Sequence, residues 1–127
     1  MTTDTLRPLV DTLKALAHPV RLRILALLRD GELCVCEVAE VIGLPPSTVS
    51  EHLTDLRRTG LVQEWKAGRW VHVALSEEAI ARPVLESLWP LMVHAEVALE
   101  RDLAQARALR CEACDPSDCS ALTSAQP

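Results

Sequence analysis

The residues of this chain with the greatest scope for chemistry are its five cysteines. Cys34 and Cys36 are separated by one valine, and the other three lie near the C-terminal end in CEACDPSDC, at Cys111, Cys114 and Cys119. Thiolate sulfur is a soft ligand that prefers soft metal ions to calcium or magnesium. An odd number of cysteines makes a poor disulfide framework, because at least one thiol is left over. The sequence therefore favours metal binding or redox sensing by these thiols.

The composition indicates one folded domain followed by a short tail. The chain has 127 residues, 49% of them hydrophobic, with no Phe or Tyr. Leu, Val, Ile and Ala must therefore build the core, as they do in many small helical proteins. Neither a signal peptide nor an apolar run of membrane-spanning length is found, so we expect a cytoplasmic protein with no membrane partner. We predict a folded domain over residues 1–110 and a cysteine-containing tail over residues 111–127.

The segment from Leu33 to Gly60 is organised as two helices joined by a tight turn. Apolar residues recur at helical spacing from Val35 to Val41, and Gly43 ends this helix because glycine adopts a left-handed backbone without steric cost. Pro46 suits the first position of the next helix, which ends at Gly60. This order is typical of a helix-turn-helix, whose second helix lies in the DNA major groove.

Two helices and a hairpin are predicted on either side of this motif. Leu6–Ala17 and the segment from Pro19 to Asp30 carry apolar residues at helical spacing. From Leu61 to Leu75 the pattern alternates about a glycine-containing turn, which predicts two strands, with His72 on the polar face. A hairpin directly after a recognition helix is a wing. The predicted fold class is mainly α (α+β), a winged helix-turn-helix with a two-stranded antiparallel wing.

A long amphipathic helix is predicted from Glu77 to about Arg110, with Ser76 as its cap and a kink or split at Pro90. Such a helix is too long and too apolar for this small domain to cover alone. We expect the N- and C-terminal helices to form the interface of a homodimer, because a two-fold reader of operator DNA is the usual use of this fold. The alternative is that the helix folds back over its own core.

The second helix of the motif and the wing carry the residues expected to contact DNA. Side chains on the early turns of a recognition helix meet base edges, and basic residues beyond them meet phosphates. The net charge of −5 does not oppose this, because the local placement of charge matters more than the sum. Helix capping is the alternative role for the serines. The expected contacts are Ser47, Thr48, Ser50, Glu51, His52, Arg57, Arg58, Arg69 and His72.

Four segments together resemble the ArsR/SmtB family of metal-sensing winged-helix repressors. They are ELCVCEVAEVIGL, STVSEHLTDLRRTGLV, GRWVHVAL and, over Ala15–Leu28, ALAHPVRLRILALL, which is similar to the family's second-helix signature. The resemblance implies a homodimer that binds double-stranded operator DNA of two-fold symmetry and represses transcription. It implies release from DNA when an inducing metal binds, and no small-molecule substrate.

The resemblance also implies the kind of inducer. Cys34 and Cys36 stand where arsenic, antimony, cadmium and lead sensors of the family carry thiol ligands. In the commonest arsenic-sensor pattern a cysteine follows three residues after Cys36, where this chain has Ala39. The tail cysteines are then expected to supply the missing thiol, from the same or the other subunit. As(III) or Sb(III) is the expected inducer, and Cd, Pb or Zn is the alternative.

The spacing of Cys34 and Cys36 constrains the local backbone. On a regular helix, with about 3.6 residues per turn, they would point about 200° apart. Their sulfurs converge only if Cys34 precedes the helix, which we predict. Free N–H groups at a helix start are expected to stabilise a thiolate there. The alternatives are a three-cysteine site confined to the tail and a role for the pair as small buried hydrophobic residues.

Two other classes of function remain open at this point. Cys111 and Cys114 have the spacing of a thiol–disulfide enzyme, but they follow a predicted helix rather than a strand, so we expect no enzyme. A disulfide between the tail and the Cys34–Cys36 pair would make a regulator that senses oxidants. Release of operator DNA by arsenite without an oxidant distinguishes the metalloid sensor from the redox sensor.

Overall fold

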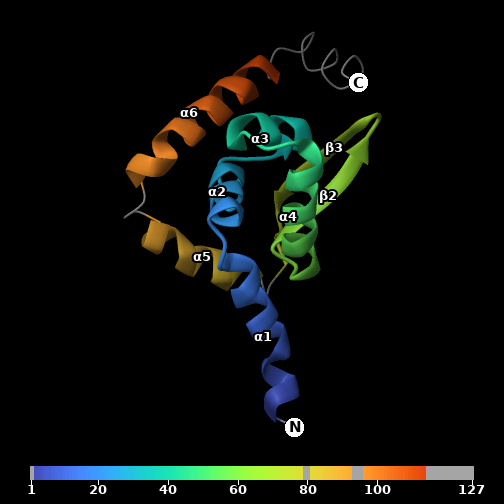
Figure 1. Cartoon of the computed structure of the whole chain (residues 1–127), viewed down its shortest axis with the longest axis vertical. Coiled ribbons are helices and arrows are strands. Elements are labelled where there is room, and N and C mark those ends of the chain that lie inside the picture. The colour runs from blue at the N-terminus through green and yellow to red at the C-terminus, as the bar shows by residue number, and fades with distance from the viewer. Residues whose placement is uncertain (1, 79–80, 93–95, 114–127) are drawn as a thin grey trace.

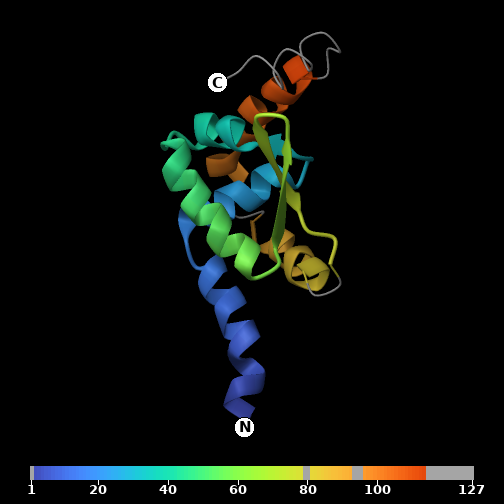
Figure 2. The ribbon, with the colours of Figure 1, turned by 90° about the vertical axis from the view of Figure 1, so that its right-hand side faces the viewer.

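The structure is a computed structural model that describes residues 2–78, 81–92 and 96–113. Helix α1 projects from a body formed by the other elements, and the wing lies along one side of that body (Figures 1 and 2). Within the described ranges, no helix combines the length and apolar character needed to cross a membrane. The elements in chain order are α1 (Thr2–Leu16), α2 (Pro19–Leu28), β1 (Leu33–Cys34), α3 (Val35–Ile42), α4 (Pro46–Arg58), β2 (Val62–Ala67), β3 (Trp70–Leu75), α5 (Ala81–Met92) and α6 (Glu96–Ala113).

The first helices begin and end where the local chemistry requires. His18 is the N-cap of α2, and its Nδ1 accepts a hydrogen bond from the backbone N–H of Val20 at 3.1 Å. Gly43 ends α3 with a φ of +82°, and Gly60 follows α4 with a φ of +78°. Both values lie in the left-handed region, which glycine adopts without a Cβ clash. These boundaries confirm the predicted helix-turn-helix.

Three antiparallel strands form a small sheet in the order β1–β3–β2. Strands β2 and β3 pair along their whole lengths as the predicted wing. The short strand β1 was not predicted, because two residues are too few to show an alternating pattern. It pairs Leu33 with Val73 and Cys34 with His72. The wing is therefore hydrogen-bonded to the segment that carries the first cysteine of the pair.

The core is aliphatic, as the composition predicts, and it joins α2, α3, α4 and β3. Each fully buried side chain of this kind contributes about 1.5–3 kcal/mol relative to an exposed one. The two helices of the DNA-reading motif are therefore held as one packed unit. The largest side chains that are less than 2% exposed are Ile24, Leu25, Leu27, Leu33, Val38, Val49, Leu53, Leu56, Leu61 and Val73.

The predicted division of β3 into an apolar face and a polar face is wrong. Trp70, expected on the polar face, is buried at 7% exposed, whereas Val71 and Leu75 are only half-buried. Strand β3 lies between β1 and β2 and also packs against α2 and α3. Burial along it is set by these contacts and does not follow every second residue.

The structure has two helices, α5 and α6, where a helix with a kink or split at Pro90 is predicted from Glu77 to about Arg110. The predicted split is confirmed but its position is wrong, because Pro90 lies inside α5, which continues to Met92. There it removes one hydrogen bond from the last turn. Ser76 does not cap a helix at Glu77. Its Oγ accepts from the backbone N–H of Glu78 at 3.2 Å, in a local turn before α5 begins.

Helix α6 folds back across α2 and α3 (Figure 1). The carboxylate of Asp102 is almost fully buried and accepts two hydrogen bonds from the Arg23 guanidinium, at 2.7 and 3.0 Å. Ala106 is fully buried in the same interface, and Leu103 packs against the core. A paired carboxylate and guanidinium of this geometry fixes orientation as well as charge. The return of the chain over its own core, considered above as an alternative, is thus what α6 does.

Candidate metal centre and nucleic-acid interface

Cys34 and Cys36 lie together at the start of α3. Cys34 is the N-cap residue with an extended backbone, at φ −83° and ψ 157°, so it precedes the first helical turn. Its Sγ is 2.8 Å from the Sγ of Cys36. The structure therefore confirms both parts of the geometric prediction, that Cys34 lies before the helix and that the two sulfurs converge.

The thiol of Cys34 is held in its protonated form. Burial raises its pKa, and the hydrogen bond with Cys36 raises it further, while the hydrogen bond from the Glu37 backbone opposes the rise. The carboxylate of Glu37 adds to the rise, and its Oε1 accepts from the Cys34 backbone N–H at 2.9 Å. The expected thiolate stabilisation by the helix start is wrong for Cys34, because desolvation outweighs the favourable N–H groups.

The described residues supply two sulfur ligands at this place. In residues 2–78, 81–92 and 96–113, no group of three or more His, Cys, Asp or Glu side chains is arranged to hold a metal ion. Ala39 is buried and has no donor atom. Cys111 lies in α6, but its side chain is outside the described part, as are Cys114 and Cys119. Two adjacent thiols fit a soft ion, and a further ligand must come from outside this set.

Helix α4 packs its apolar side on the core and presents its early turns outward. Ser47, Ser50 and Glu51 are exposed, and Thr48 is half-buried. The N-cap of α4 is Pro45, and no side chain caps the helix. The serines therefore do not cap the helix. Their side chains are exposed on the turns that would meet base edges in a complex with DNA.

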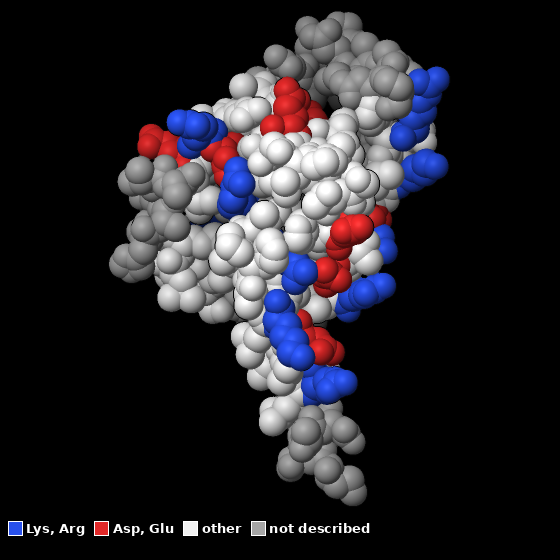
Figure 3. Space-filling view, in the orientation of Figure 1, with Lys and Arg blue, Asp and Glu red and all other residues white. Residues whose placement is uncertain are grey.

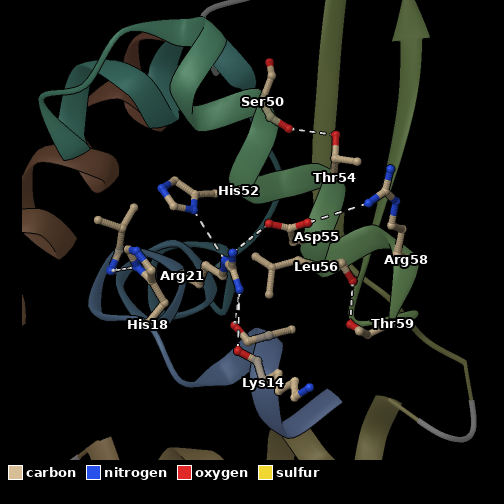
Figure 4. Close-up of polar contacts among 12 residues, drawn as sticks. Lys14, His18, Arg21, Ser50, His52, Thr54, Asp55, Leu56, Arg58 and Thr59 are labelled. Carbon is tan, nitrogen blue, oxygen red and sulfur yellow. Dashed lines mark hydrogen bonds and ion pairs between the residues drawn. The ribbon is translucent and has the colours of Figure 1, made fainter. Parts of the chain in front are cut away.

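His52 is directed toward α2, where it joins a polar network centred on Arg21 (Figure 4). Arg21 Nε donates to His52 Nδ1 at 3.3 Å, and Arg21 Nη2 pairs with Asp55 Oδ2 at 2.6 Å. The His52 ring also lies 4.6 Å from the His18 ring, centroid to centroid. Arg21 Nη1 reaches the carbonyl of Ala15 at 3.4 Å. The network joins the recognition helix to α2 and to the end of α1.

This network is expected to make folding stability depend on pH. Burial lowers the pKa of His52 below its ordinary value of 6.5, and electrostatic interactions with His18 and Arg21 lower it further, against the opposing effect of Asp55 and Glu51. The folded state thus favours the neutral ring. The contribution of the neutral His52 ring to the free energy of unfolding is complete above about pH 6.5 and is lost as the pH falls below that value.

The measurement is urea unfolding at about pH 7 and about pH 5 for the wild type and for His52→Asn, whose side-chain oxygen accepts the Arg21 hydrogen bond but does not titrate. We expect the wild type to lose more stability than the variant between the two pH values. An equal loss in both proteins would contradict the assignment.

The two arginines at the end of α4 have different environments. Arg57 Nη1 pairs with Glu64 Oε2 at 2.6 Å and so joins α4 to the wing. The side chain of Arg58 is 76% exposed, and its ion pair with Asp55 is long, at 3.9 Å. A long, exposed ion pair contributes little and is readily exchanged for another partner. Arg58 is therefore the better placed of the two to meet phosphate.

Replacing Arg58 by alanine is expected to weaken DNA binding and to reduce the slope of log affinity against log salt by about 1. The slope falls because one fewer counterion is released when the complex forms. Fluorescence anisotropy over a salt series measures it. Arg57→Ala is the matched control, and we expect a smaller change in slope because that guanidinium already has a close carboxylate partner. An unchanged slope in Arg58→Ala would remove this residue from the contact surface.

The wing offers one exposed basic side chain at its tip and one histidine that is less accessible than expected. Arg69 is exposed in the turn between β2 and β3. The ring of His72 stacks on Trp65 with centroids 5.7 Å apart, and its Nε2 is buried with no hydrogen-bond partner among the described residues. The His72 ring is half-buried because Trp65 stacks on it. A contact from His72 to phosphate stays a prediction that requires the ring to turn.

Basic side chains line the edge of the molecule that carries the wing (Figure 3). The recognition helix presents its exposed early turns, Arg58 is at its far end, and the hairpin extends beside it. An exposed helix flanked by a two-stranded hairpin and basic groups is the geometry for major-groove binding with additional backbone contacts. The fold and this surface together define a winged helix-turn-helix DNA-binding protein.

Comparisons with known proteins agree. The family described as bacterial regulatory protein, arsR family, matches residues 18–64. The arsenical resistance operon repressor of Escherichia coli K12 is 35% identical over 99 residues, which are 76% of this chain and 85% of that protein. The chain belongs to the arsR family, whose members are DNA-binding transcriptional repressors.

Solved structures show the same architecture. The homodimeric winged helix-turn-helix DNA-binding domain of Mb0332 from Mycobacterium bovis, a possible ArsR-family regulator, superposes with a TM-score of 0.65 at 30% identity. The match covers 75% of this chain and 88% of that one. The transcriptional repressor BigR from Xylella fastidiosa gives a TM-score of 0.61 at 28% identity, covering 75% and 93%. The predicted fold class and family are confirmed.

Sequence reasoning missed two residues that hold the site together. Arg21 connects α2 to His52 and Asp55, and Arg110 connects the end of α6 to the turn that precedes β1. Both are arginines whose partners are distant in the sequence, so no local pattern marks them. Their positions on amphipathic helices suggest only solvated side chains.

Proposed function

We propose that this protein is a metalloid-responsive repressor that binds operator DNA of two-fold symmetry as a homodimer. It releases the DNA when As(III) or Sb(III) binds Cys34, Cys36 and a thiol of the tail. The observation that carries this proposal is the 2.8 Å separation of the two sulfurs at the start of the DNA-reading motif. The similarity to an arsenical resistance operon repressor supports the same ligand class.

The protonated state of Cys34 suits a neutral metalloid hydroxide. Arsenous acid reacts with three thiols to give three As–S bonds and three molecules of water, so each thiol proton leaves with a hydroxide of the arsenic. A divalent Cd, Pb or Zn ion binds thiolates and must release free protons. Because burial raises the Cys34 pKa, that release costs more here. As(III) or Sb(III) is the proposed inducer, and Cd, Pb and Zn are the alternatives.

The site is connected to both DNA-contacting elements. Cys36 is in α3, which packs against α4, and Cys34 is in β1, which pairs with β3 of the wing. A ligand that changes the position of either cysteine acts on the recognition helix and the wing together. Allosteric couplings of about 1–3 kcal/mol change an affinity by about 5–150-fold. A modest change of packing at this place is sufficient for release.

The proposed dimer forms through α1. This helix projects from the body (Figure 2), and four of its apolar side chains are exposed on one face. Leu6, Leu9, Val10 and Leu13 are 54%, 51%, 40% and 55% exposed. A contiguous exposed apolar stripe of this kind marks an interface. The homodimeric Mb0332 domain from Mycobacterium bovis supports an equivalent assembly here.

The experiment is a titration of the purified protein on a DNA duplex that it selects from a random pool. As(III), Sb(III), Cd(II), Pb(II) and Zn(II) are added separately without an oxidant, and anisotropy reports release. We expect release by As(III) and Sb(III). Release by a divalent ion alone would establish the alternative inducer, and release by peroxide alone would establish a redox regulator. Retention of DNA with every addition would reject the proposal.

A further inference from the structure

His72 is the middle member of a row of three side chains that crosses the sheet. Strand β3 pairs it with Cys34 of β1 on one side and with Trp65 of β2 on the other. Directly paired residues of antiparallel strands point to the same face, with Cβ atoms about 4.5–5.5 Å apart. The next pair along the strands, Leu33 and Val73, is buried in the core. The row therefore lies on the opposite face of the sheet, where His72 is directly beside Cys34.

The imidazole of His72 has a nitrogen that the packed structure does not use. Its Nε2 is buried and has no hydrogen-bond partner within the described part of the chain. The ring contacts Trp65 instead, with centroids 5.7 Å apart and planes 14° from parallel. A buried polar atom without a partner is unfavourable, so its presence calls for a functional reason. Imidazole is the commonest side-chain ligand for metal ions, and the thiol pair begins one strand away.

The thiol pair supplies the other donors. Cys34 lies across the strands from His72, and its Sγ is 2.8 Å from that of Cys36. The nearby carboxylate of Glu37 is occupied, because its Oε1 accepts from the Cys34 backbone N–H at 2.9 Å. The donors at this place are thus two sulfurs and one nitrogen. Such a mixed set suits a borderline divalent ion such as zinc better than a metalloid that takes sulfur alone.

The balance of charge at the pair also favours an imidazole as the third ligand of a divalent ion. Two thiolates neutralise the ion, whereas a third thiolate would leave a net negative charge beside Cys34, which is only 8% exposed. An unbalanced charge is costly to bury. A neutral imidazole adds a ligand without adding charge and without losing a proton.

We propose that Cys34, Cys36 and His72 of one subunit bind a zinc ion through two thiolates and the imidazole Nε2. The two thiols lose their protons to solvent and the neutral ring loses none, so binding releases two protons. As the described side chains stand, no three donors surround one point, so the ring must turn from Trp65 toward Cys34. This turn breaks no described hydrogen bond of Nε2. Zinc bonds of about 2.0–2.3 Å fit two side chains whose Cβ atoms are direct neighbours across strands.

This inference rests on the proposed function and extends it. It gives a divalent ion a binding mode of its own, in which His72 takes the place that a third thiol has for As(III). Both ions need Cys34 and Cys36, so each excludes the other. The concentration of As(III) that releases DNA should therefore rise with zinc in proportion to 1 + [Zn]/Kd, where Kd is that of zinc.

X-ray absorption at the zinc edge tests the ligand set in the full-length protein loaded with one zinc per subunit. We expect two sulfur neighbours and the scattering pattern of an imidazole ring. The same spectrum should be obtained when the three tail cysteines are replaced by serine. Three or four sulfur neighbours without imidazole would overturn the inference, and so would a protein that binds no zinc.

His72→Phe tests the role of the nitrogen, because phenylalanine keeps a ring that stacks on Trp65 and has no donor atom. We expect its affinity for zinc, measured by competition with a chromophoric chelator, to fall by about 10-fold or more. Its affinity for As(III) should stay near that of the wild type. The matched control is His52→Asn, which removes an imidazole elsewhere and should bind zinc normally. Unchanged zinc affinity in His72→Phe, or equal weakening of zinc and As(III), would overturn the inference.

Tryptophan fluorescence supplies a readout that a merely structural role of His72 would not change. Zinc is expected to alter the emission of the wild type, because the ring leaves Trp65 when it binds the ion. Trp65→Phe should lose most of this change while still binding zinc. Emission that does not respond to bound zinc would contradict the turn of the ring and overturn the inference.

Failure of this inference is distinguishable from failure of the proposed function. A protein that binds zinc through two sulfurs and one imidazole, but is not released from DNA by As(III), would reject only the proposed function. A protein that is released by As(III), but binds zinc without imidazole, would reject only this inference.

Discussion

Replacing Cys36 by serine is expected to leave operator binding intact and to abolish induction by As(III). Cys36 is half-buried, and its Sγ lies 2.8 Å from that of Cys34. Serine replaces a soft sulfur with a hard oxygen of similar shape, so the fold is retained while the three-sulfur set is lost. Replacing a residue that hydrogen-bonds to a metal ligand already lowers metal affinity by about 10–100-fold. The loss of a ligand itself should therefore lower the affinity for As(III) by more than about 100-fold.

The measurement is anisotropy of an operator duplex with and without As(III). Cys36 is a better choice than Cys34, whose burial would leave a serine hydroxyl desolvated at a strand and helix boundary. Glu40→Gln, which changes an exposed residue of the same helix that is not a proposed ligand, is the control that should remain inducible. A Cys36→Ser protein that is still released by As(III) would move the site into the tail.

Replacing Leu13 by glutamate is expected to dissociate the dimer and reduce operator affinity by about 100-fold or more. Leu13 is 55% exposed on the α1 stripe, so the substitution removes nothing from the core of the subunit. In the proposed dimer the same position is covered by a second copy, and burying an unpaired carboxylate there is unfavourable. A monomer contacts one half-site, and the loss of the linked second contact costs about 10²–10⁴-fold.

Sedimentation equilibrium and anisotropy measure the two effects. Arg7→Glu introduces the same residue on the same helix away from the apolar stripe, and it should remain dimeric. Circular dichroism should show equal helix content for both variants and the wild type. A dimeric Leu13→Glu protein with unchanged DNA affinity would show that α1 is not the interface.

The elements that carry local signals are those that sequence reasoning predicts. Gly43, Pro46 and Gly60 define the DNA-reading motif, because their backbone requirements do not depend on distant contacts. Strand β1 and the exact position of the split between α5 and α6 have no comparable signal. The first is two residues long, and the second depends on how α6 packs against α2 and α3. Tertiary contacts decide both.

The same distinction between local signals and tertiary contacts applies to the candidate site. The convergence of Cys34 and Cys36 follows from helix geometry and is predicted, whereas the protonated state of Cys34 follows from burial and is not. The pairing of Cys34 with His72 and the contacts of Arg110 join residues far apart in the sequence. A single sequence contains no local pattern for such contacts, so these features emerge only from the packed structure.

The contacts of His18 and His52 also determine where their protons reside. A donor N–H points at the Nδ1 of each ring, from Val20 and from Arg21. Each neutral imidazole must then be the Nε2–H tautomer, with both nitrogens occupied and no lone pair left for a metal ion. Zinc could bind either ring only by breaking the cap of α2 or the link to the recognition helix. These two imidazoles are thereby closed to borderline metals such as zinc.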